Sequence, residues 1–160
     1  VPDMIWASPP CTYFSVASIG HHWNENHTPK TKEAIEGLNI LKYTLDIFTW
    51  FPNAFFYMEN PVGKMRRKVK GRATITYCSY NDSRMKPTDI WTNNLFDMFN
   101  LKGWNPKGMC FAGNKKCQHE EAPRGSKTGT QGLKNNYERS KIPKELCLEI
   151  IKATERKIYG

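Results

Sequence analysis

Two short apolar runs on either side of a long amphipathic segment constrain the fold of this chain more than any other feature. Residues 3–7 and 54–58 are brief apolar stretches bounded by proline-containing loops, a pattern typical of buried strands. Between them, apolar residues recur at steps of three and four, which predicts a helix over residues 31–51 with Thr28 as a candidate cap and Pro29 near its first turn. A strand, a helix and a strand in this order predict a βαβ unit with parallel strands.

The rest of the chain is less regular. Residues 73–80 alternate as a strand does, residues 81–83 favour a turn, and residues 89–92 are suited to a partner strand. A final helix is predicted over residues 143–158. With 39% apolar residues among 160, the chain can bury one core of moderate size.

We therefore expect an α/β chain in three parts. The parts are an α/β region over residues 1–100, an irregular basic insertion over residues 101–136, and a C-terminal helix over residues 137–160 that packs back on the first region. The insertion is rich in Gly, Lys, Asn and Pro and shows little periodicity.

The charge balance favours a polyanionic partner, and nucleic acid is the first choice. Lys and Arg number 24 against 15 Asp and Glu, a net charge of +9, although a solvated basic surface gives the same balance. Six basic residues and no acidic ones lie between residues 64 and 72, where they can contact DNA phosphates. They are Lys64, Arg66, Arg67, Lys68, Lys70 and Arg72.

Cysteine usage and hydropathy indicate the compartment. The five cysteines are an odd number without the tight spacing of a disulfide framework, which favours a reducing, cytoplasmic setting and free thiols. No apolar stretch approaches the length of about 18 residues that is needed to span a bilayer. We therefore expect no membrane partner.

A cysteine and a glutamate follow the two predicted parallel strands. Cys11 stands after Ser8-Pro9-Pro10 at the end of the first strand, and Glu59 begins Glu59-Asn60-Pro61 at the end of the second. Functional groups of parallel sheets gather at the carboxyl ends of the strands. We therefore expect Cys11 and Glu59 to lie at one edge, as a nucleophile and a proton-handling acid.

These motifs resemble those of the DNA cytosine-5 methyltransferases. Pro9-Pro10-Cys11 with Phe14-Ser15 is similar to the catalytic loop of that family, Pro-Pro-Cys-Gln-x-Phe-Ser, and Glu59-Asn60-Pro61 to its Glu-Asn-Val motif. Residues 80–86 resemble the motif Gln-x-Arg-x-Arg, and residues 140–146 resemble the closing motif Asn-Ala/Ser-Val-Pro-x-x-Leu. The pattern is that of small bacteriophage-type members, and it covers most of the chain outside residues 101–136. The resemblance implies that residues 1–100 are the catalytic part and that the insertion over residues 101–136 serves DNA recognition or zinc binding.

The resemblance implies a partial Rossmann-like fold, S-adenosylmethionine as methyl donor and DNA as substrate, in a bacterial or phage-infected cell. Cys11 would add to C6 of a flipped-out cytosine, and Glu59 would bind N3. Arg84 and Lys86 would hold the base oxygen and the catalytic loop. Pro9 and Ser140 would contact the methyl donor.

The sequence also departs from the family pattern. Thr12 replaces the usual glutamine, Pro61 replaces valine, and Lys86 replaces an arginine whose planar fork lysine does not reproduce. The family's glycine-rich cofactor loop and ribose-binding acid are expected upstream of Val1. We therefore expect the 160 residues to bind the donor weakly by themselves.

Two other functions fit parts of the pattern. Amino-group DNA methyltransferases, which modify N4 of cytosine or N6 of adenine, use a motif similar to Ser8-Pro9-Pro10, although Cys11 and Glu59 argue against that class. A catalytically inactive nucleic-acid-binding module stabilised by zinc is the other alternative. Its ligands would be Cys78, Cys110, Cys117 and His119.

Overall fold

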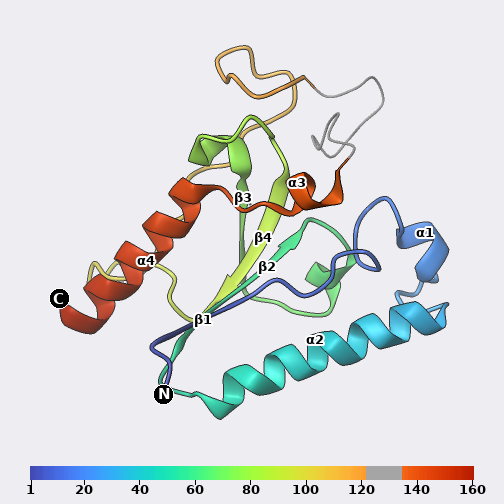
Figure 1. Ribbon diagram of the computed structural model, residues 1–160, viewed down its shortest axis with the longest axis horizontal. Coiled ribbons are helices and arrows are strands. Elements are labelled where there is room, and N and C mark those ends of the chain that lie inside the picture. Colours follow the sequence, from blue (N-terminus) through green and yellow to red (C-terminus); the bar gives the residue numbers. More distant parts are fainter. Residues whose placement is uncertain (122–134) are drawn as a thin grey trace. The chain divides into compact units, whose positions relative to one another are not determined.

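A computed structural model of the chain describes residues 1–121 and 135–160 (Figure 1). The chain forms two compact units, each with its own core. The N-terminal unit comprises residues 1–73 and 89–93, and the C-terminal unit comprises residues 74–88 and 94–160.

The N-terminal unit contains the predicted βαβ arrangement. Strand β1 (Met4–Ala7) and strand β2 (Phe55–Pro61) are parallel neighbours, and helix α2 (Lys32–Trp50) connects them. The register pairs Met4 with Phe55 and Ala7 with Met58. The parallel βαβ prediction is therefore confirmed, although β2 extends three residues beyond the predicted strand.

The side chain of Thr31 caps the N-terminus of helix α2. The Thr31 hydroxyl accepts a hydrogen bond from the Ala34 amide at 3.2 Å, which satisfies one of the free amides of the first turn. The prediction of Thr28 as the cap is wrong, because the Thr28 hydroxyl is engaged by Asn24 and Asn26 within its own loop. The buried face of α2 packs on β2, where the rings of Phe48 and Phe56 stack at 4.4 Å.

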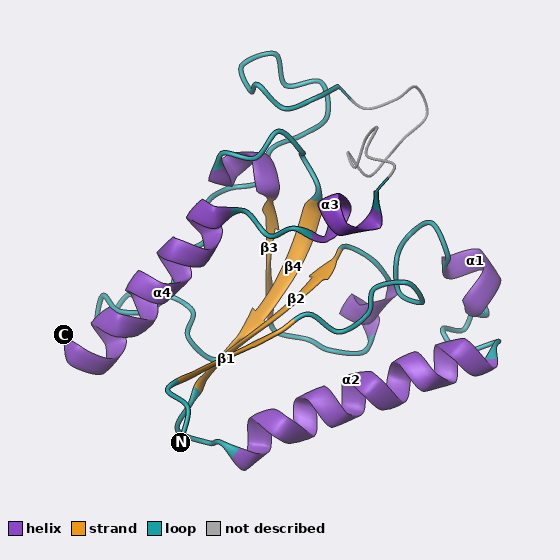
Figure 2. Ribbon diagram, viewed as in Figure 1, coloured by secondary structure: helices purple, strands orange, loops and turns teal. Residues whose placement is uncertain are grey.

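Short elements complete the N-terminal unit. Helix α1 (Ile19–His22) follows the loop after β1, and the 3₁₀ helix η1 (Lys64–Arg67) follows β2. Strand β4 (Pro87–Thr92) contributes its last residues, and the order of the four strands is β1-β2-β4-β3. Helices, strands and loops are distinguished in Figure 2.

The C-terminal unit holds the other elements. Strand β3 (Arg72–Thr76) continues into the 3₁₀ helix η2 (Tyr77–Tyr80), so only the first half of the strand predicted over residues 73–80 forms, and the second half is helical. Residues 101–121 are irregular, as predicted, with a few turns, bends and isolated bridges, whereas residues 122–134 lie outside the described part of the chain. Helix α3 (Asn136–Ser140) precedes the long helix α4 (Lys144–Tyr159).

The core of the C-terminal unit is formed around helix α4. Leu146 and Ile150 of α4 are buried, as is Trp104 of the preceding loop. The Trp104 indole donates a hydrogen bond to Glu149 at 3.0 Å, which joins the loop to the helix. None of the helices in residues 1–121 and 135–160 has the length and apolar character that a membrane span requires.

Candidate active site and metal centre

The Pro-Pro-Cys segment forms a turn whose backbone is held in place while its thiol is exposed. Cys11 is exposed, and its carbonyl accepts hydrogen bonds from the amides of Phe14 and Ser15 at 3.0 and 2.9 Å. The three carbonyls that follow also accept hydrogen bonds: Thr12 from the Ser18 hydroxyl at 2.5 Å, Tyr13 from the Trp23 indole at 2.6 Å and Phe14 from the Lys64 amide at 2.7 Å. The thiol is thus presented on a fixed backbone, as a nucleophile requires.

A side chain of β2 binds the same segment. The Asn60 amide nitrogen donates to the carbonyl of Pro9 at 2.8 Å, and both residues are buried. The neighbouring Glu59 is also buried, with 5% of its surface exposed. Since Met58 pairs with Ala7 in the register, Glu59 and the turn that carries Cys11 lie at the carboxyl ends of adjacent parallel strands. Sequence reasoning missed the role of Asn60, although its place beside Glu59 is a usable signal.

Gly63 allows the Pro-Pro-Cys turn to approach the chain after β2. A Cβ atom at residue 63 would lie 2.1 Å from the carbonyl oxygen of Phe14, which is far inside van der Waals contact. Ser15 and Gly63 also form an isolated antiparallel bridge. The close approach therefore requires glycine at this position.

We expect Gly63→Ala to lower the free energy of unfolding by about 1–3 kcal/mol, because the backbone near Phe14 must shift to relieve the overlap. Urea unfolding followed by fluorescence would measure the change. Gly20→Ala is the matched control, because a Cβ atom there meets nothing within 4 Å. Equal stability of the two variants would contradict the prediction.

The six basic residues after β2 do not form one uniform exposed surface. Arg66 donates to both carboxylate oxygens of Asp89 at 2.9 and 2.7 Å, and Arg72 lies 3.5 Å from the same carboxylate. Lys64 is buried, and its ammonium contacts Nδ1 of His27 at 2.8 Å. Burial, together with the nearby charges of other basic residues, lowers the pKa of Lys64. The exposed members are Arg67, Lys68, Lys70 and Arg72.

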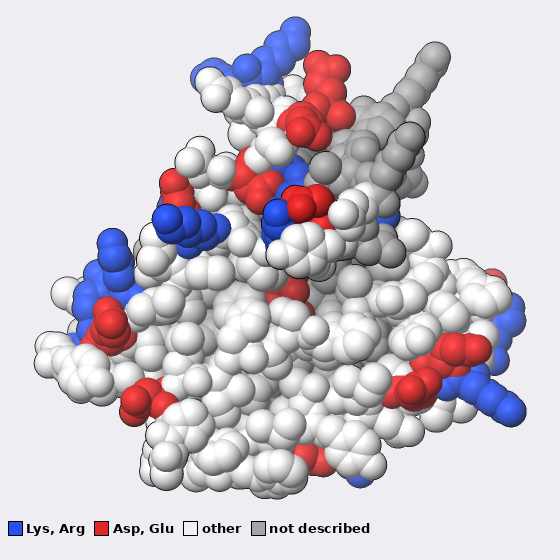
Figure 3. Space-filling view, viewed as in Figure 1, with Lys and Arg blue, Asp and Glu red and all other residues white. Residues whose placement is uncertain are grey.

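Charged side chains of both signs lie on the surface. On the face drawn in Figure 3, basic side chains lie beside acidic ones in several places. Sequence reasoning missed Asp89, the buried acid that pairs with Arg66. Its signal is an acidic residue directly before the apolar pair Ile90-Trp91 of a strand.

In the C-terminal unit, Arg84 and Lys86 bind the segment that joins α3 to α4. Arg84 donates to the carbonyls of Glu138 and Lys141 at 2.9 and 3.0 Å, and Lys86 donates to the carbonyl of Arg139 at 3.2 Å. These contacts flank Ser140, whose own hydroxyl donates to the Tyr137 carbonyl. The structure therefore brings together three of the residues predicted from the methyltransferase motifs.

An ion pair holds the Arg84 side chain. The Asp82 carboxylate accepts from the Arg84 guanidinium at 2.7 and 2.5 Å. Burial of Asp82 opposes ionisation, but the hydrogen bonds and charge of Arg84 lower the pKa of this carboxyl overall. The pair fixes the guanidinium that binds the α3–α4 junction.

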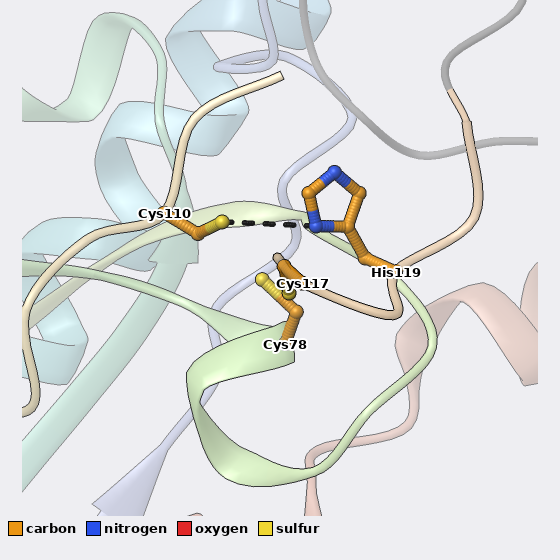
Figure 4. A group of neighbouring side chains, drawn as sticks. All are labelled: Cys78, Cys110, Cys117 and His119. Carbon is orange, nitrogen blue, oxygen red and sulfur yellow. Dashed lines mark hydrogen bonds between the residues drawn. The ribbon is translucent and has the colours of Figure 1, made fainter. Parts of the chain in front are cut away.

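Three cysteines and a histidine of the C-terminal unit converge. Figure 4 shows that Cys78 from η2 and Cys110, Cys117 and His119 from the following loop direct their side chains toward one another. Their candidate ligand atoms all lie within 4.8 Å of each other. We call these four residues the Cys/His cluster.

The thiols of the Cys/His cluster differ in acidity. Burial raises the pKa of Cys78 to about 12. Burial also acts on Cys110, but the hydrogen bond from Asn114 and the bonds with the other thiols outweigh it, so the pKa of Cys110 is lowered. These donor atoms form a site that could hold a metal ion.

Comparison with known proteins gives one informative relative. The chain is 31% identical over 126 residues to a protein of Frog virus 3 (isolate Goorha) named probable DNA (cytosine-5)-methyltransferase, a match that covers 74% of this chain. The match covers 55% of the relative, so the chain spans about half the length of that protein. No protein-family model matches the chain, and no solved structure matches it. This similarity to the viral protein supports the family that the sequence motifs indicate, the DNA (cytosine-5)-methyltransferases.

Proposed function

We propose that this chain carries the catalytic groups for methylation of cytosine C5 in DNA. The observation that carries the proposal is the exposed thiol of Cys11 on a hydrogen-bonded turn, at the same end of adjacent parallel strands as the buried Glu59. The name of the viral relative supports the same reaction. The Glu-Asn-Pro and Pro-Pro-Cys segments are also joined by the bond from Asn60 to Pro9.

In the proposed reaction, the Cys11 thiolate adds to C6 of a cytosine that has been flipped out of the duplex. The electron pair of the 5,6 double bond moves toward C5, and Glu59 supplies a proton or hydrogen bond at N3 to stabilise the enamine. Bound S-adenosylmethionine would supply the methyl group that C5 takes up, and its sulfonium would leave as the neutral thioether S-adenosylhomocysteine. Loss of the C5 proton to solvent then restores the 5,6 double bond and expels the Cys11 thiolate, and any proton that Glu59 gave to N3 returns to Glu59.

The residues expected to contact the methyl donor retain suitable polar atoms. The Ser140 hydroxyl donates its proton to Tyr137, and because the residue is exposed its oxygen can still accept. The Pro9 carbonyl accepts one hydrogen bond, from Asn60, and a carbonyl has two lone pairs. Each of the two groups, which belong to different units, can therefore accept a hydrogen bond of the kind that the hydroxyl and amine groups of S-adenosylmethionine donate. We also propose that the βαβ unit is part of a Rossmann-like methyltransferase fold.

DNA is the proposed substrate, and its backbone would contact the exposed basic residues after β2. Arg67, Lys68 and Lys70 are exposed and follow the strand that carries Glu59. Residues 101–136 are proposed to contribute to recognition of the DNA site, as expected from their basic composition.

DNA that contains 5-fluorocytosine tests the proposal. Fluorine at C5 cannot leave as a proton does, so Cys11 is expected to remain covalently bound to C6 after methyl transfer. The chain, extended by any natural upstream sequence, would be incubated with this DNA and S-adenosylmethionine, and peptide mass mapping would locate the adduct.

The adduct is expected to map to Cys11, to vanish in Cys11→Ser and to persist in Cys147→Ser. Cys147 is the matched control because it lies on α4 of the C-terminal unit, outside the Pro-Pro-Cys turn and the Cys/His cluster. A product containing N4-methylcytosine or N6-methyladenine would contradict the proposed reaction. DNA binding without either an adduct or a methylated base would also contradict it.

A further inference from the structure

We propose that the Cys/His cluster binds one Zn²⁺ in a closed tetrahedral site that fixes the loop of residues 108–120 to helix η2. The four donor atoms come from two segments that are more than thirty residues apart in sequence, at Cys78 and at residues 110–119. This site is separate from the proposed methylation reaction, which uses none of the four residues.

The separations between donor atoms fit a zinc site. With Zn–S near 2.3 Å and Zn–N near 2.0 Å, tetrahedral geometry places sulfur and nitrogen about 3.6 Å apart and two sulfurs about 3.8 Å apart. The Sγ atom of Cys110 lies 3.7 Å from Nδ1 of His119, and no pair of donor atoms exceeds 4.8 Å. Side-chain rotations that move the donor atoms by about 1 Å would therefore bring all four to bonding distance from one ion.

The donor set selects the kind of metal. Three thiols and an imidazole are soft and borderline ligands, which suit Zn²⁺ and not Mg²⁺ or Ca²⁺. All five cysteines of the chain are free thiols. A disulfide within the cluster would use two of the three thiols and would leave the third thiol and His119 without a role. One Zn²⁺ would use all four groups.

The surrounding hydrogen bonds orient the ligands. The backbone amide of Cys110 donates to the hydroxyl of Thr76 at 2.8 Å, and the Asn114 side chain donates to the Cys110 sulfur at 3.3 Å. A donor to the sulfur stabilises the thiolate that zinc requires. Beyond His119, the Glu120 amide donates to the Ser83 carbonyl at 2.8 Å. The loop is therefore held against the same segment at both of its ends.

The loop itself buries little apolar surface. Met109 and Phe111 are exposed, and residues 101–121 lack regular helices and strands within the described part of the chain. Few internal contacts compensate the conformational entropy that ordering this loop costs. A tetrahedral metal bound by Cys78 and three loop residues would supply that stabilisation.

Metal analysis of the purified chain tests the zinc site. Mass spectrometry of the metal content is expected to give about one zinc ion per chain, and Cys110→Ser and His119→Ala are expected to lose most of it. Titration of the metal-free chain with Co²⁺ is expected to give the intense visible bands of a tetrahedral thiolate site and the near-ultraviolet band of sulfur-to-metal charge transfer. Circular dichroism of each variant shows whether it has folded.

A protease measures the effect of the metal on the loop. Lys115 and Lys116 are exposed, and a chelator is expected to increase trypsin cleavage after them. Cys147→Ser and His21→Ala are matched controls outside the cluster and should keep the metal and the slow cleavage. Absence of stoichiometric zinc together with absence of a Co²⁺ spectrum would overturn the inference, as would iron in place of zinc. Neither result depends on methylation, so failure of this inference is distinguishable from failure of the proposed reaction.

Discussion

Replacing Arg66 by methionine is expected to lower the free energy of unfolding by about 2–4 kcal/mol, slightly below the usual cost for a fully buried ion pair because 29% of the Arg66 side chain is exposed. The cost is high because the side chain of Asp89 is fully buried, with an exposed fraction of 0%. Arg66 supplies two of the hydrogen bonds to this carboxylate, whereas Arg72 approaches it only to 3.5 Å. Chemical denaturation followed by tryptophan fluorescence would measure the loss.

Two further variants distinguish the effect of losing the ion pair from the effect of losing an arginine side chain. Arg67→Met makes the same change one residue away on an exposed side chain and is expected to alter stability by less than about 0.5 kcal/mol. The double variant Arg66→Met with Asp89→Leu is expected to recover part of the lost stability, because no buried charge is then left without its partner. Stability of Arg66→Met equal to that of Arg67→Met would contradict the prediction.

The variants Arg66→Met and Arg67→Met also show which of the basic residues between 64 and 72 serve folding and which contact DNA. Arg66 is engaged by Asp89, and the exposed Arg67 is a better candidate for phosphate contact. When the logarithm of the DNA-binding constant is plotted against the logarithm of the salt concentration, each lost phosphate contact reduces the steepness of the slope by about one unit. Arg67→Met should therefore weaken DNA binding and leave stability unchanged.

The elements that could be predicted from the sequence are those set by local periodicity. Helix α2 shows an apolar step of three and four residues, and the runs at β1 and β2 are bounded by proline-containing loops, so their types and order follow from neighbouring residues. The cap was misplaced because Thr28 and Thr31 both precede the helix, and only backbone geometry decides which hydroxyl reaches an amide. The position of β4 between β2 and β3 depends on contacts that no local pattern encodes.

The residues of the candidate site also divide into those that local sequence patterns indicate and those that depend on contacts between distant segments. Cys11 and Glu59 can be found from the sequence because each follows an apolar run, and parallel pairing then places both at one sheet edge. Asp89 was missed because its partner Arg66 is 23 residues away. The cluster of cysteines and histidine was only suggested by spacing, since Cys78 reaches the others through the turn of η2 and not through a compact ligand motif.

Replacing Glu59 by glutamine is expected to lower the rate of cytosine methylation by about 10²–10⁴-fold, the range typical of a lost general acid. Glutamine keeps the shape of the side chain and can donate a hydrogen bond to N3, but it cannot release a proton. Glu59 is buried, and a buried neutral amide costs less desolvation than a buried carboxylate, so the variant should remain folded. The measurement is the transfer of labelled methyl groups to DNA in a single turnover, with thermal unfolding of the same sample as the check on folding.

Glu36→Gln is the matched control, because Glu36 lies exposed on α2 and should leave the rate unchanged. The two variants also distinguish a proton-handling role for Glu59 from a structural one. If Glu59 only supported the turn that carries Cys11, the loss of rate would be accompanied by loss of stability. We expect instead that the Glu59→Gln chain is slow but fully stable and still binds DNA. Functional sites commonly keep a buried charged group although a neutral residue at that position would make the protein more stable. A Glu59→Gln chain with the wild-type rate would contradict the assignment of Glu59 to N3.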